Sequence, residues 1–278
     1  MLFIVNPIAG NGHKSQITKK LIDSGYNVVF TEYPGHAEIL ARETDAQKVI
    51  AVGGDGTVND VARGIMGTTK ALGIIPCGSG DGLALHLGIP HNFSKALKII
   101  LNGKTGRLDA AKLNDKIFFS VCGTGFDALI SEKFAKSGKR GLANYIEQAV
   151  RTWKGYTPER YTVNIDGTKW NTEAVFITIG NSNQWGNGAK VTPLADSSDG
   201  ELDITIVDRF KNIEIPMLAY RLMTGTVNED YHVHCYRGKH IVIERETPGP
   251  AHVDGDWFEA GTNLDINVIP HALDVLIP

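Results

Sequence analysis

One acidic residue lies inside a glycine-rich stretch of the chain, in the order Gly53-Gly54-Asp55-Gly56-Thr57. Glycine lets a backbone approach a phosphate closely, whereas a carboxylate repels phosphate unless it meets Mg²⁺ or accepts a proton from an attacking hydroxyl. The alternative is that Asp55 caps a helix beginning at Thr57, because Asp is a preferred capping residue. The chain has no GxxxxGK[ST] loop that would bind the nucleotide instead. We therefore favour a phosphate site here, and both roles of Asp55 can hold together.

A second acidic motif, Asp254-Gly255-Asp256, lies near the end of the chain. In an extended segment, residues i and i+2 point to the same face, so both carboxylates would aim at one place. One of them could then accept the proton of an attacking hydroxyl, while the other, or Asp55, organises Mg²⁺. The alternative is a solvated Asp-Gly-Asp turn before Trp257.

Two further glycine-bearing loops, Asn6–Gly12 and Gly78–Gly82, also follow expected strands. In an open α/β sheet, ligands bind beyond the carboxyl ends of the strands, where loop N–H groups and helix N-termini hold anions. Any one such loop has the alternative reading of a tight strand-to-helix turn. Three loops together indicate a site for a polyphosphate.

The first hundred residues contain the elements needed to position these loops. Short β-branched runs at Leu2–Val5, Asn27–Thr31, Val49–Val52 and Leu72–Ile75 alternate with helix-like segments. This alternation is typical of a parallel sheet wrapped by helices. We predict an α/β N-terminal domain with an open, mostly parallel sheet over residues 1–107. Residues 270–278 are a candidate to complete it, because the last apolar run can pair with either sheet.

From about Arg107 the pattern changes to short apolar runs separated by turn residues, which is typical of antiparallel strands. The runs are Ile117–Val121, Tyr161–Ile165, Ala174–Ile179, Leu202–Val207 and His240–Ile243. We predict a β-rich second domain, an antiparallel sandwich, over residues 108–269. An apolar stripe from Leu142 to Trp153 at helical spacing predicts one long helix within it.

The charge, apolar stretches and cysteine content of the chain argue against several classes of protein. The chain has 278 residues and a net charge of −3, so no strong positive field is available to gather nucleic acid. No apolar stretch approaches the roughly 20 residues of a membrane span. Three separated cysteines and the lack of a signal-peptide pattern favour a reducing cytoplasm. The histidines show no strong zinc-ligand spacing, so we assign no zinc.

The segment between Ser131 and Arg160 is basic within this acidic protein. It carries seven basic residues against three acidic ones: Lys133, Lys136, Lys139, Arg140, Arg151, Lys154 and Arg160 against Glu132, Glu147 and Glu159. Such a segment can face anionic lipid headgroups, each Lys or Arg contributing on the order of 1 kcal/mol. The alternative is the solvated flank of a helix.

The motifs occur in an order that is typical of one enzyme superfamily. In the first domain they are Asn6-Pro7-Ile8-Ala9-Gly10, Thr31-Glu32 with Gly35-His36-Ala37, GGDGT with Asn59-Asp60, and Pro76-Cys77-Gly78-Ser79-Gly80. In the second they are Arg107-Leu108-Asp109, Gly123–Ala128, Pro193–Asp203 and Asp254–Asp256. This series resembles the diacylglycerol kinase catalytic domain superfamily, which includes sphingosine, ceramide and bacterial lipid kinases. The resemblance covers nearly the whole chain, whereas GGDG alone also occurs in NAD kinases and phosphofructokinases.

The resemblance implies an ATP site in the first domain and a lipid between the two domains. The positions that match its ATP-binding residues are Asn6, Pro7, Ile8, Ala9, Gly10, Thr31, Gly53, Gly54, Asp55, Gly56, Thr57, Val58, Asn59, Asp60 and Ser79. Asp127 matches a position that contacts the substrate headgroup. The implied catalytic acids are Asp256, Asp254 and Asp55, with Asp256 first as proton acceptor.

The resemblance also implies a metal-binding turn. In bacterial members, Mg²⁺ is held by the positions that match Asp196, Asp199 and Glu201. Carboxylate and carbonyl oxygens suit such a hard cation. The alternative is an acidic surface turn that holds no ion.

The sequence departs from the family pattern at two acids. The family usually has Glu where Asp256 stands, and the shorter side chain retracts the carboxylate by roughly 1.5 Å. It usually has Asn where Asp81 stands, so this chain places an added charge near the phosphates. The stretch Pro76–Gly80 with Leu83-Ala84 resembles sphingosine kinases more than bacterial diacylglycerol kinases. This resemblance favours a sphingoid substrate only slightly.

We predict an ATP-dependent lipid kinase that transfers the γ-phosphate of Mg-ATP to the primary hydroxyl of a diacylglycerol-like or sphingoid lipid. We expect its partner to be a lipid presented at a membrane surface, and we expect no nucleic acid partner. The protein would be cytoplasmic, would bind the membrane transiently and peripherally, and would act in lipid metabolism. The sequence leaves a homodimer open. Two alternatives remain: an NAD kinase-like enzyme, and a nucleotide- or lipid-binding protein whose catalysis is weakened by Asp81 and Asp256.

Overall fold

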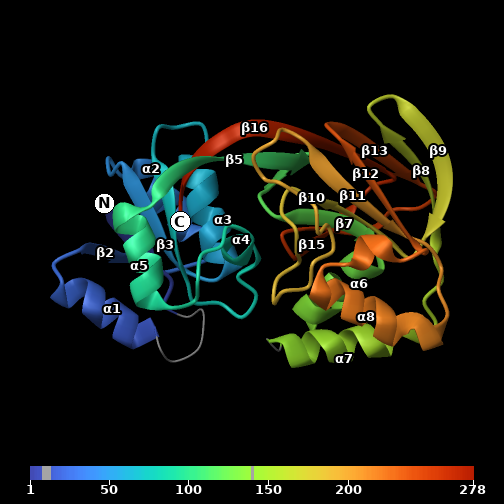
Figure 1. The fold of residues 1–278 in the computed structure, drawn as a ribbon, viewed down its shortest axis with the longest axis horizontal. Coiled ribbons are helices and arrows are strands. Elements are labelled where there is room, and N and C mark those ends of the chain that lie inside the picture. The colour runs from blue at the N-terminus through green and yellow to red at the C-terminus, as the bar shows by residue number, and fades with distance from the viewer. Residues whose placement is uncertain (8–13, 139–140) are drawn as a thin grey trace. The chain divides into compact units, whose positions relative to one another are not determined.

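A computed structural model gives the fold of the chain and describes residues 1–7, 14–138 and 141–278 (Figure 1). The predicted ATP-binding residues Ile8, Ala9 and Gly10 lie outside the described residues. The chain forms two compact units, Met1–Asp109 with His271–Pro278, and Ala110–Pro270. Among the helices described, none is long and apolar enough to cross a bilayer.

The first unit is built on a parallel sheet. Its strands run in the order β2-β1-β3-β4 and comprise β1 (Leu2–Val5), β2 (Asn27–Phe30), β3 (Lys48–Gly53) and β4 (Ala71–Pro76). The last part of β16 (Asn263–Ile277) extends this sheet by pairing in parallel with β4 through Asp274 and Val275. The final apolar run therefore completes the N-terminal sheet.

Helices cover both faces of this sheet (Figure 1). They are α1 (Lys14–Asp23), α2 (His36–Glu43), α3 (Asp55–Ile65), α4 (Gly82–His86) and α5 (Phe93–Asn102). Strands β1 and β4 are buried along their whole length, which explains their continuous apolar sequences. A Cβ at Gly64 would lie 2.8 Å from the Ala41 Cβ, so glycine allows α2 and α3 to pack closely.

Strand register brings the predicted loops to one edge of the sheet. Val5 at the end of β1 pairs with Phe30 and with Val52, and Val52 pairs with Ile75. Because these parallel strands end in line, the loops that follow β1, β2, β3 and β4 all leave the same edge.

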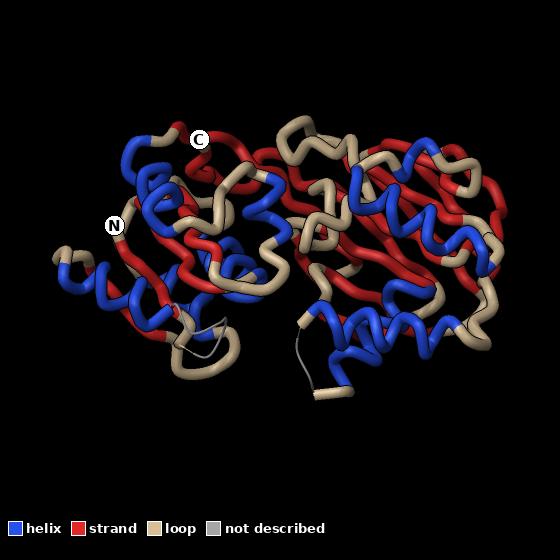
Figure 2. Tube along the Cα trace, turned by 60° about the horizontal axis from the view of Figure 1, so that its bottom comes forward, coloured by secondary structure: helices blue, strands red, loops and turns tan. Residues whose placement is uncertain are grey.

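The second unit is built mainly from strands (Figure 2). One antiparallel sheet has the order β12-β11-β10-β7-β14-β15, with β7 (Val121–Gly125), β10 (Phe176–Gly180), β11 (Leu202–Val207), β12 (Val233–Gly238), β14 (Gly249–Val253) and β15 (Asp256–Ala260). The other sheet has β16, β13 (His240–Arg245), β8 (Glu159–Ile165) and β9 (Thr168–Ala174), with β5 (Lys104–Leu113) on β16 and β6 (Lys116–Phe118) on β5.

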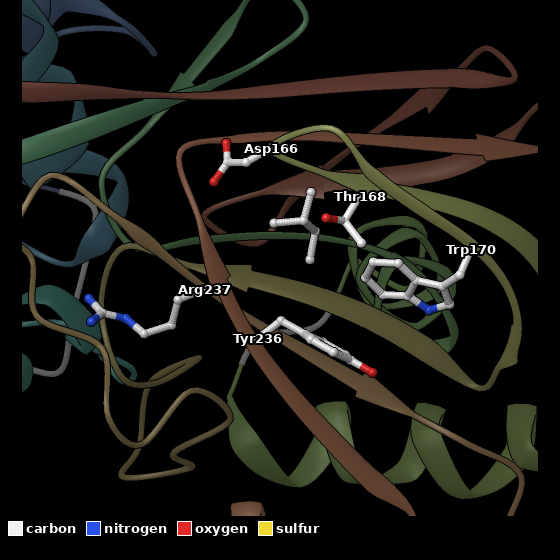
Figure 3. A pocket seen from close by; sticks show the side chains of 6 residues that line it. Asp166, Thr168, Trp170, Tyr236 and Arg237 are labelled. Carbon is white, nitrogen blue, oxygen red and sulfur yellow. The ribbon is translucent and has the colours of Figure 1, made fainter.

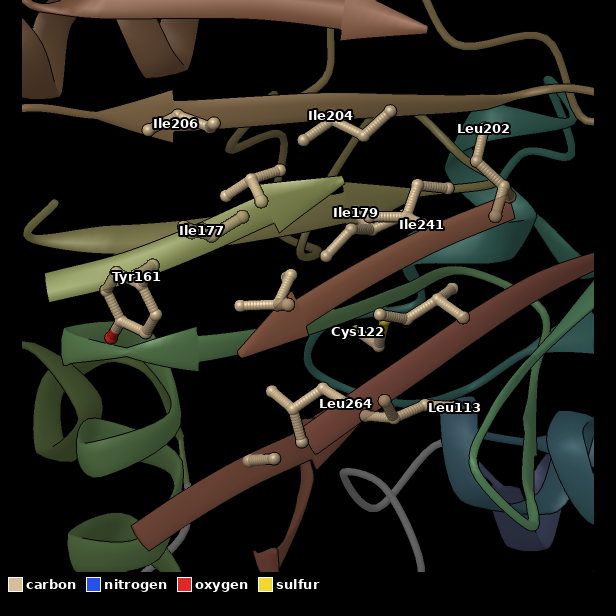
Figure 4. Packing of buried hydrophobic residues seen from close by; sticks show 14 of the residues in the cluster. Leu113, Cys122, Tyr161, Ile177, Ile179, Leu202, Ile204, Ile206, Ile241 and Leu264 are labelled. Carbon is tan, nitrogen blue, oxygen red and sulfur yellow. The ribbon is translucent and has the colours of Figure 1, made fainter. Parts of the chain in front are cut away.

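The core of the second unit lies between these two sheets. Ile177 and Ile204 from the first sheet pack with Tyr161, Ile241 and Leu264 from the second (Figure 4). Helices α6 (Phe126–Lys136), α7 (Leu142–Trp153) and α8 (Ile215–Thr224) and two 3₁₀ turns, Asn212–Glu214 and Val227–Glu229, complete the unit. The predicted fold class is confirmed: an α/β unit with a mostly parallel sheet, and an antiparallel sandwich.

Candidate functional site

The loops after β3 and β4 are in backbone contact. A Cβ at Gly78 would lie 2.6 Å from the Cα of Gly54, and a Cβ at Gly54 would lie 3.0 Å from the Cα of Gly78. The Cys77 N–H also donates a hydrogen bond of 2.8 Å to the Gly53 carbonyl. Only glycine permits so close an approach, so the two loops form one continuous backbone surface at the edge of the sheet.

Asp55 links these two loops. It is the first residue of α3, and its Oδ1 accepts a hydrogen bond of 2.8 Å from the N–H of Gly82, the first residue of α4. The alternative that Asp55 caps its own helix was therefore wrong. Helix α3 begins at Asp55 itself, and the Asp55 side chain binds the N-terminus of a different helix, α4. Burial raises the pKa of the Asp55 carboxyl, and backbone hydrogen bonds led by Gly82 oppose this rise.

Asp81 closes the second loop on itself. Its side chain is buried, its φ is +47°, and its Oδ1 accepts a hydrogen bond of 3.1 Å from the Gly78 N–H. His91 Nδ1 lies 3.5 Å from the other oxygen, Oδ2. Asp81 therefore holds the glycine loop through Oδ1, a hydrogen bond that the amide oxygen of an Asn could also accept.

The other predicted ATP-binding residues lie around the same sheet edge. Asn6 and Thr31 directly follow β1 and β2, and their N–H groups donate to Val52 and Val5 at 3.3 and 2.9 Å. Thr57 Oγ1 is buried and has no hydrogen-bond partner among the described residues. Ser79 is exposed in the loop after β4. The donor set of glycine N–H groups, amide and hydroxyls fits an anionic ligand such as a nucleotide phosphate.

Helix α3 contains the remaining ATP-binding candidates. Val58 and Asn59 are buried, and Asp60 forms an ion pair with Arg63. Burial raises the pKa of Asp60, while Arg63 lowers it. In the structure, Val58 packs in the core and Asp60 pairs with Arg63. Contact of either residue with a nucleotide stays a prediction.

A pocket of about 450 Å³ lies beside the ends of β1 and β2. Its lining comprises Val5, Pro7, Ser15, Thr18, Lys19, Ile22, Asp23 and Phe30. This volume is within the range of pockets that hold small ligands, roughly 300–1,000 Å³. Pro7, a predicted ATP-binding residue, is part of its wall.

The glycine contact between the two loops leads to a stability prediction. Gly78→Ala should lower the free energy of unfolding by about 1–3 kcal/mol, because its Cβ would collide with Gly54. Gly56→Ala is the matched control, since a Cβ there meets nothing within 4 Å and Ala favours the helix. Urea unfolding of both variants measures the difference. Equal stability of the two variants would contradict the contact.

The motif Asp254-Gly255-Asp256 is a hairpin turn. Asp254 and Gly255 have φ of +50° and +86°, and Val253 pairs with Asp256 across β14 and β15. This geometry is typical of a two-residue turn with both central residues left-handed. The expectation that an extended segment aims both carboxylates at one place was therefore wrong.

The two acids of this turn have different surroundings. Asp254 Oδ1 accepts hydrogen bonds from the N–H groups of Ser120 and Val121 at 2.8 and 3.0 Å, and Oδ2 accepts one from Phe119 at 3.0 Å. Asp254 thereby fastens the β14–β15 hairpin to the segment that leads into β7. Asp256, at the start of β15, is exposed.

Asp127 lies over a row of residues that crosses three strands. Gly123 of β7 pairs with Thr178 of β10 on one side and with His252 of β14 on the other. Asp127 Oδ2 accepts a hydrogen bond of 2.7 Å from Thr178 Oγ1 and lies 3.2 Å from His252 Nε2. A Cβ on Gly123 would overlap Asp127 Oδ2, so the glycine makes room for the carboxylate.

His252 and Thr178 could not be identified from the sequence alone. Their only sequence signal is that each belongs to a strand beside the Gly123–Ala128 motif, which requires the strand pairing to be known. His252 is 2% exposed, and its Nδ1 has no hydrogen-bond partner among the described residues. Asp127 is 3% exposed, which makes this a buried acid–histidine pair.

The predicted metal residues lie in the loop before β11. Asp196 Oδ1 accepts hydrogen bonds from Ser198, whereas Asp199 and Glu201 form ion pairs with Arg237. In the described portion of the chain, no group of three His, Cys, Asp or Glu side chains is arranged to hold a metal ion. Mg²⁺ binding by this turn stays a prediction.

Comparison with known protein families covers both units. Residues 1–113 match the diacylglycerol kinase catalytic domain. Residues 120–277 match the YegS C-terminal NAD kinase beta sandwich-like domain. The chain belongs to the family of diacylglycerol kinases and YegS-type lipid kinases.

Individual relatives agree with this assignment. The chain is 31% identical over 251 residues to a diacylglycerol kinase of Mycobacterium tuberculosis (strain CDC 1551 / Oshkosh), covering 87% of this chain and 80% of the relative. It is 29% identical over 247 residues to the probable lipid kinase YegS of Salmonella newport (strain SL254), covering 86% and 80%. Because these relatives are named as lipid kinases, they support the assignment of this chain as a kinase.

Solved structures share the fold over the full length. The crystal structure of a putative diacylglycerol kinase from Bacillus anthracis str. Sterne has a TM-score of 0.81 at 26% identity, covering 100% of this chain and 96% of its own. An NAD kinase from Archaeoglobus fulgidus, crystallised in complex with ATP, has a TM-score of 0.59 at 12% identity, covering 99% and 92%. The second likeness concerns the fold alone.

Proposed function

We propose that this protein transfers the γ-phosphate of Mg-ATP to the primary hydroxyl of a diacylglycerol-like or sphingoid lipid. The observation that carries the proposal is the backbone contact between Gly54 and Gly78 at the carboxyl edge of the sheet, in a chain that belongs to a lipid kinase family. Backbone N–H groups at such an edge are suited to bind phosphate oxygens.

ATP would be held by the first unit. The loops Gly53–Thr57 and Gly78–Gly82 would bind its phosphates, with the unpartnered hydroxyl of Thr57 as a further polar contact. Asp55 and Asp81 would act by fixing the two loops, since each accepts a hydrogen bond from a loop N–H. Mg²⁺ bound with the nucleotide would neutralise the charge that develops on the phosphates.

The acceptor hydroxyl would be activated by the second unit. Asp256 is exposed at the start of β15, whereas the Asp254 carboxylate is engaged by backbone N–H groups, so we assign Asp256 the role of proton acceptor. The hydroxyl oxygen forms a bond to the γ-phosphorus, the bond from that phosphorus to the β–γ bridging oxygen breaks, and ADP leaves. The hydroxyl proton passes to Asp256, whereas a headgroup contact of Asp127 would require its buried carboxylate to become accessible.

A panel of acceptors tests the proposal. Purified protein with Mg²⁺ and γ-³²P-ATP would be incubated with vesicles containing diacylglycerol, ceramide or sphingosine, and separately with NAD. The expected result is label in at least one lipid and none in NAD. Label in NAD alone would favour the NAD kinase alternative, which shares this fold. ATP binding in calorimetry without transfer to any acceptor would favour the weakened binding protein.

The lipid would be reached through an exposed apolar surface on α7 and α8. Ile146 and Val150 of α7 are 52% and 69% exposed, and Met217, Tyr220 and Met223 of α8 are 53%, 63% and 56% exposed. Spacings of four and three residues put each set on one face of its helix. Trp153, the last residue of α7, donates a 2.8 Å hydrogen bond to Asn212 of the 3₁₀ turn that precedes α8 and stacks on Phe210.

This surface, which we call the α7–α8 face, is suited to a lipid surface for two reasons. A patch of large apolar side chains is unusual on a soluble monomer and marks an interaction site. Lys154 lies just after α7 and is exposed, whereas Arg151 within α7 pairs with Glu147, so Lys154 would offer anionic headgroups positive charge beside the apolar side chains. We propose that the protein binds a membrane peripherally through this face.

Met217→Ser with Tyr220→Ser should weaken binding to vesicles of phosphatidylglycerol and phosphatidylcholine by roughly 10- to 30-fold, because two half-exposed apolar side chains would no longer enter the lipid. Sedimentation with vesicles measures the partition coefficient. Leu101→Ser is the matched control, since Leu101 is 43% exposed in the first unit. An unchanged partition coefficient of the double variant would rule out this face.

A further inference from the structure

Three carboxylates of the second unit surround one guanidinium. Arg237 of β12 forms ion pairs with Asp199, with Glu201 at 3.2 Å and with Asp203 at 3.4 Å. Asp203 lies directly opposite Arg237 in the pairing of β11 with β12. The pairing register of β11 and β12 therefore positions the guanidinium. The loop that carries Asp199 and Glu201, which we call the acidic loop, folds around it.

The electrostatics of this cluster require a cation. Asp203 is 8% exposed, and its carboxylate lies 3.4 Å from the Arg237 guanidinium. Three neighbouring carboxylates repel one another unless a positive charge lies between them. Arg237 supplies that charge through five N–H donors in a rigid fork.

The same loop is the turn that family resemblance predicts to bind Mg²⁺ through Asp196, Asp199 and Glu201. In the structure these three residues do not share one centre. Asp196 Oδ1 accepts hydrogen bonds from the N–H and Oγ of Ser198, at 3.0 and 2.6 Å, within its own turn. Asp199 Oδ1 accepts from the Glu201 N–H at 3.0 Å, and its Oδ2 is bound to Arg237. As arranged, the residues do not fit a divalent ion.

We propose that Arg237 takes the place of a divalent cation in this turn, so that the turn keeps its shape without bound metal. A cation carried by the chain itself is present at any metal concentration, whereas a bound ion stabilises only in proportion to its occupancy. Arg237 also lines a pocket of about 470 Å³. Figure 3 shows the Arg237 side chain extending away from the rings of Trp170 and Tyr236, which line that pocket.

Nucleotide-free protein provides the first test. The Tm of the full chain should be the same, within about 1 °C, in EDTA and in millimolar MgCl₂ or CaCl₂. Calorimetric titration of the wild-type protein with CaCl₂ should show no saturable binding site that depends on Asp199. The Asp199→Asn variant should therefore give the same titration as wild type. A saturable site in the wild-type protein that is lost in Asp199→Asn would overturn the proposal, whatever the enzymatic activity of the protein.

Removing the guanidinium provides the second test. Arg237→Gln should melt at a lower temperature than wild type in EDTA, and Ca²⁺ or Mg²⁺ should raise its Tm by roughly 3–6 °C, since three carboxylates then lack a cation. Arg237→Lys keeps the charge and should respond to metal less than Arg237→Gln. Lys169→Gln is the matched control, because Lys169 pairs with Glu244 on the surface of the same unit.

The outcomes of the second test are distinct. A folded Arg237→Gln variant that does not respond to divalent cations would overturn the proposal. If that variant does not fold in EDTA but folds in Ca²⁺, the proposal is supported. If it folds in neither, the comparison of wild type with Asp199→Asn decides the question alone.

Discussion

Asp256→Asn is expected to lower kcat for lipid phosphorylation by about 10²- to 10⁴-fold, the usual range for loss of a proton-transferring group. Its Tm should stay within about 1 °C of wild type, because Asp256 is exposed at the start of a strand. Initial rates with Mg-ATP and vesicle-borne acceptor, together with thermal unfolding, measure both quantities.

Asp256→Glu provides the converse variant. The longer side chain would advance the carboxylate by roughly 1.5 Å, towards the position that the family resemblance implies. Because a misplacement of about 1 Å can cost roughly a hundredfold in rate, this variant should be faster than wild type. A rate for Asp256→Asn that equals the wild-type rate would remove Asp256 from the reaction.

Asp254→Asn is expected to lower the free energy of unfolding by about 2–4 kcal/mol. The carboxylate accepts three backbone N–H groups, from Phe119, Ser120 and Val121, and an amide offers only one acceptor oxygen for them. Hydrogen bonds to a charged group contribute about 1.5–3 kcal/mol each, and unpaired donors add a desolvation cost. Urea unfolding measures the change.

Asp115→Asn is the matched control for this prediction, since Asp115 is an exposed acid between β5 and β6. The variant Asp254→Asn should also lose activity, through displacement of the hairpin that carries Asp256. Wild-type stability of Asp254→Asn would contradict the structural role assigned here and would return Asp254 to the candidates for direct catalysis.

The parallel sheet and its loops could be predicted because their signals are local. Buried parallel strands such as β1 and β4 have continuous apolar sequences, and the residues that follow them are glycines or small polar residues. The last strand was harder to assign. The run Leu273–Ile277 is apolar enough for either sheet, and only its pairing with β4 decides the matter.

The turn at Asp254 is the alternative that the sequence left open, and the extended segment favoured over it was wrong. Asp-Gly between alternating apolar and polar residues is a strong signal for a two-residue hairpin, because both central residues need positive φ. The motif was interpreted through its two carboxylates, so the extended geometry was assumed. In the structure, the Asp254 carboxylate accepts hydrogen bonds from the backbone of residues 119–121, whereas Asp256 is exposed at the start of β15.

Other site contacts depend on pairing between distant segments. Asp55 and Gly82 are 27 residues apart, and Asp127 and His252 are 125 apart. Arg237 meets Asp203 only because β11 and β12 pair in one register. A shift of that register by one residue would turn Arg237 to the other face, so no local sequence pattern identifies it as the cation of the acidic loop.

The most direct test of the central claim is the stoichiometry of the reaction products. Purified protein with Mg-ATP and the best acceptor lipid should yield ADP and a lipid product heavier by one phosphate group, in equal amounts by mass spectrometry. Formation of ADP without a phosphorylated lipid, or of a phosphorylated nucleotide in its place, would contradict the account.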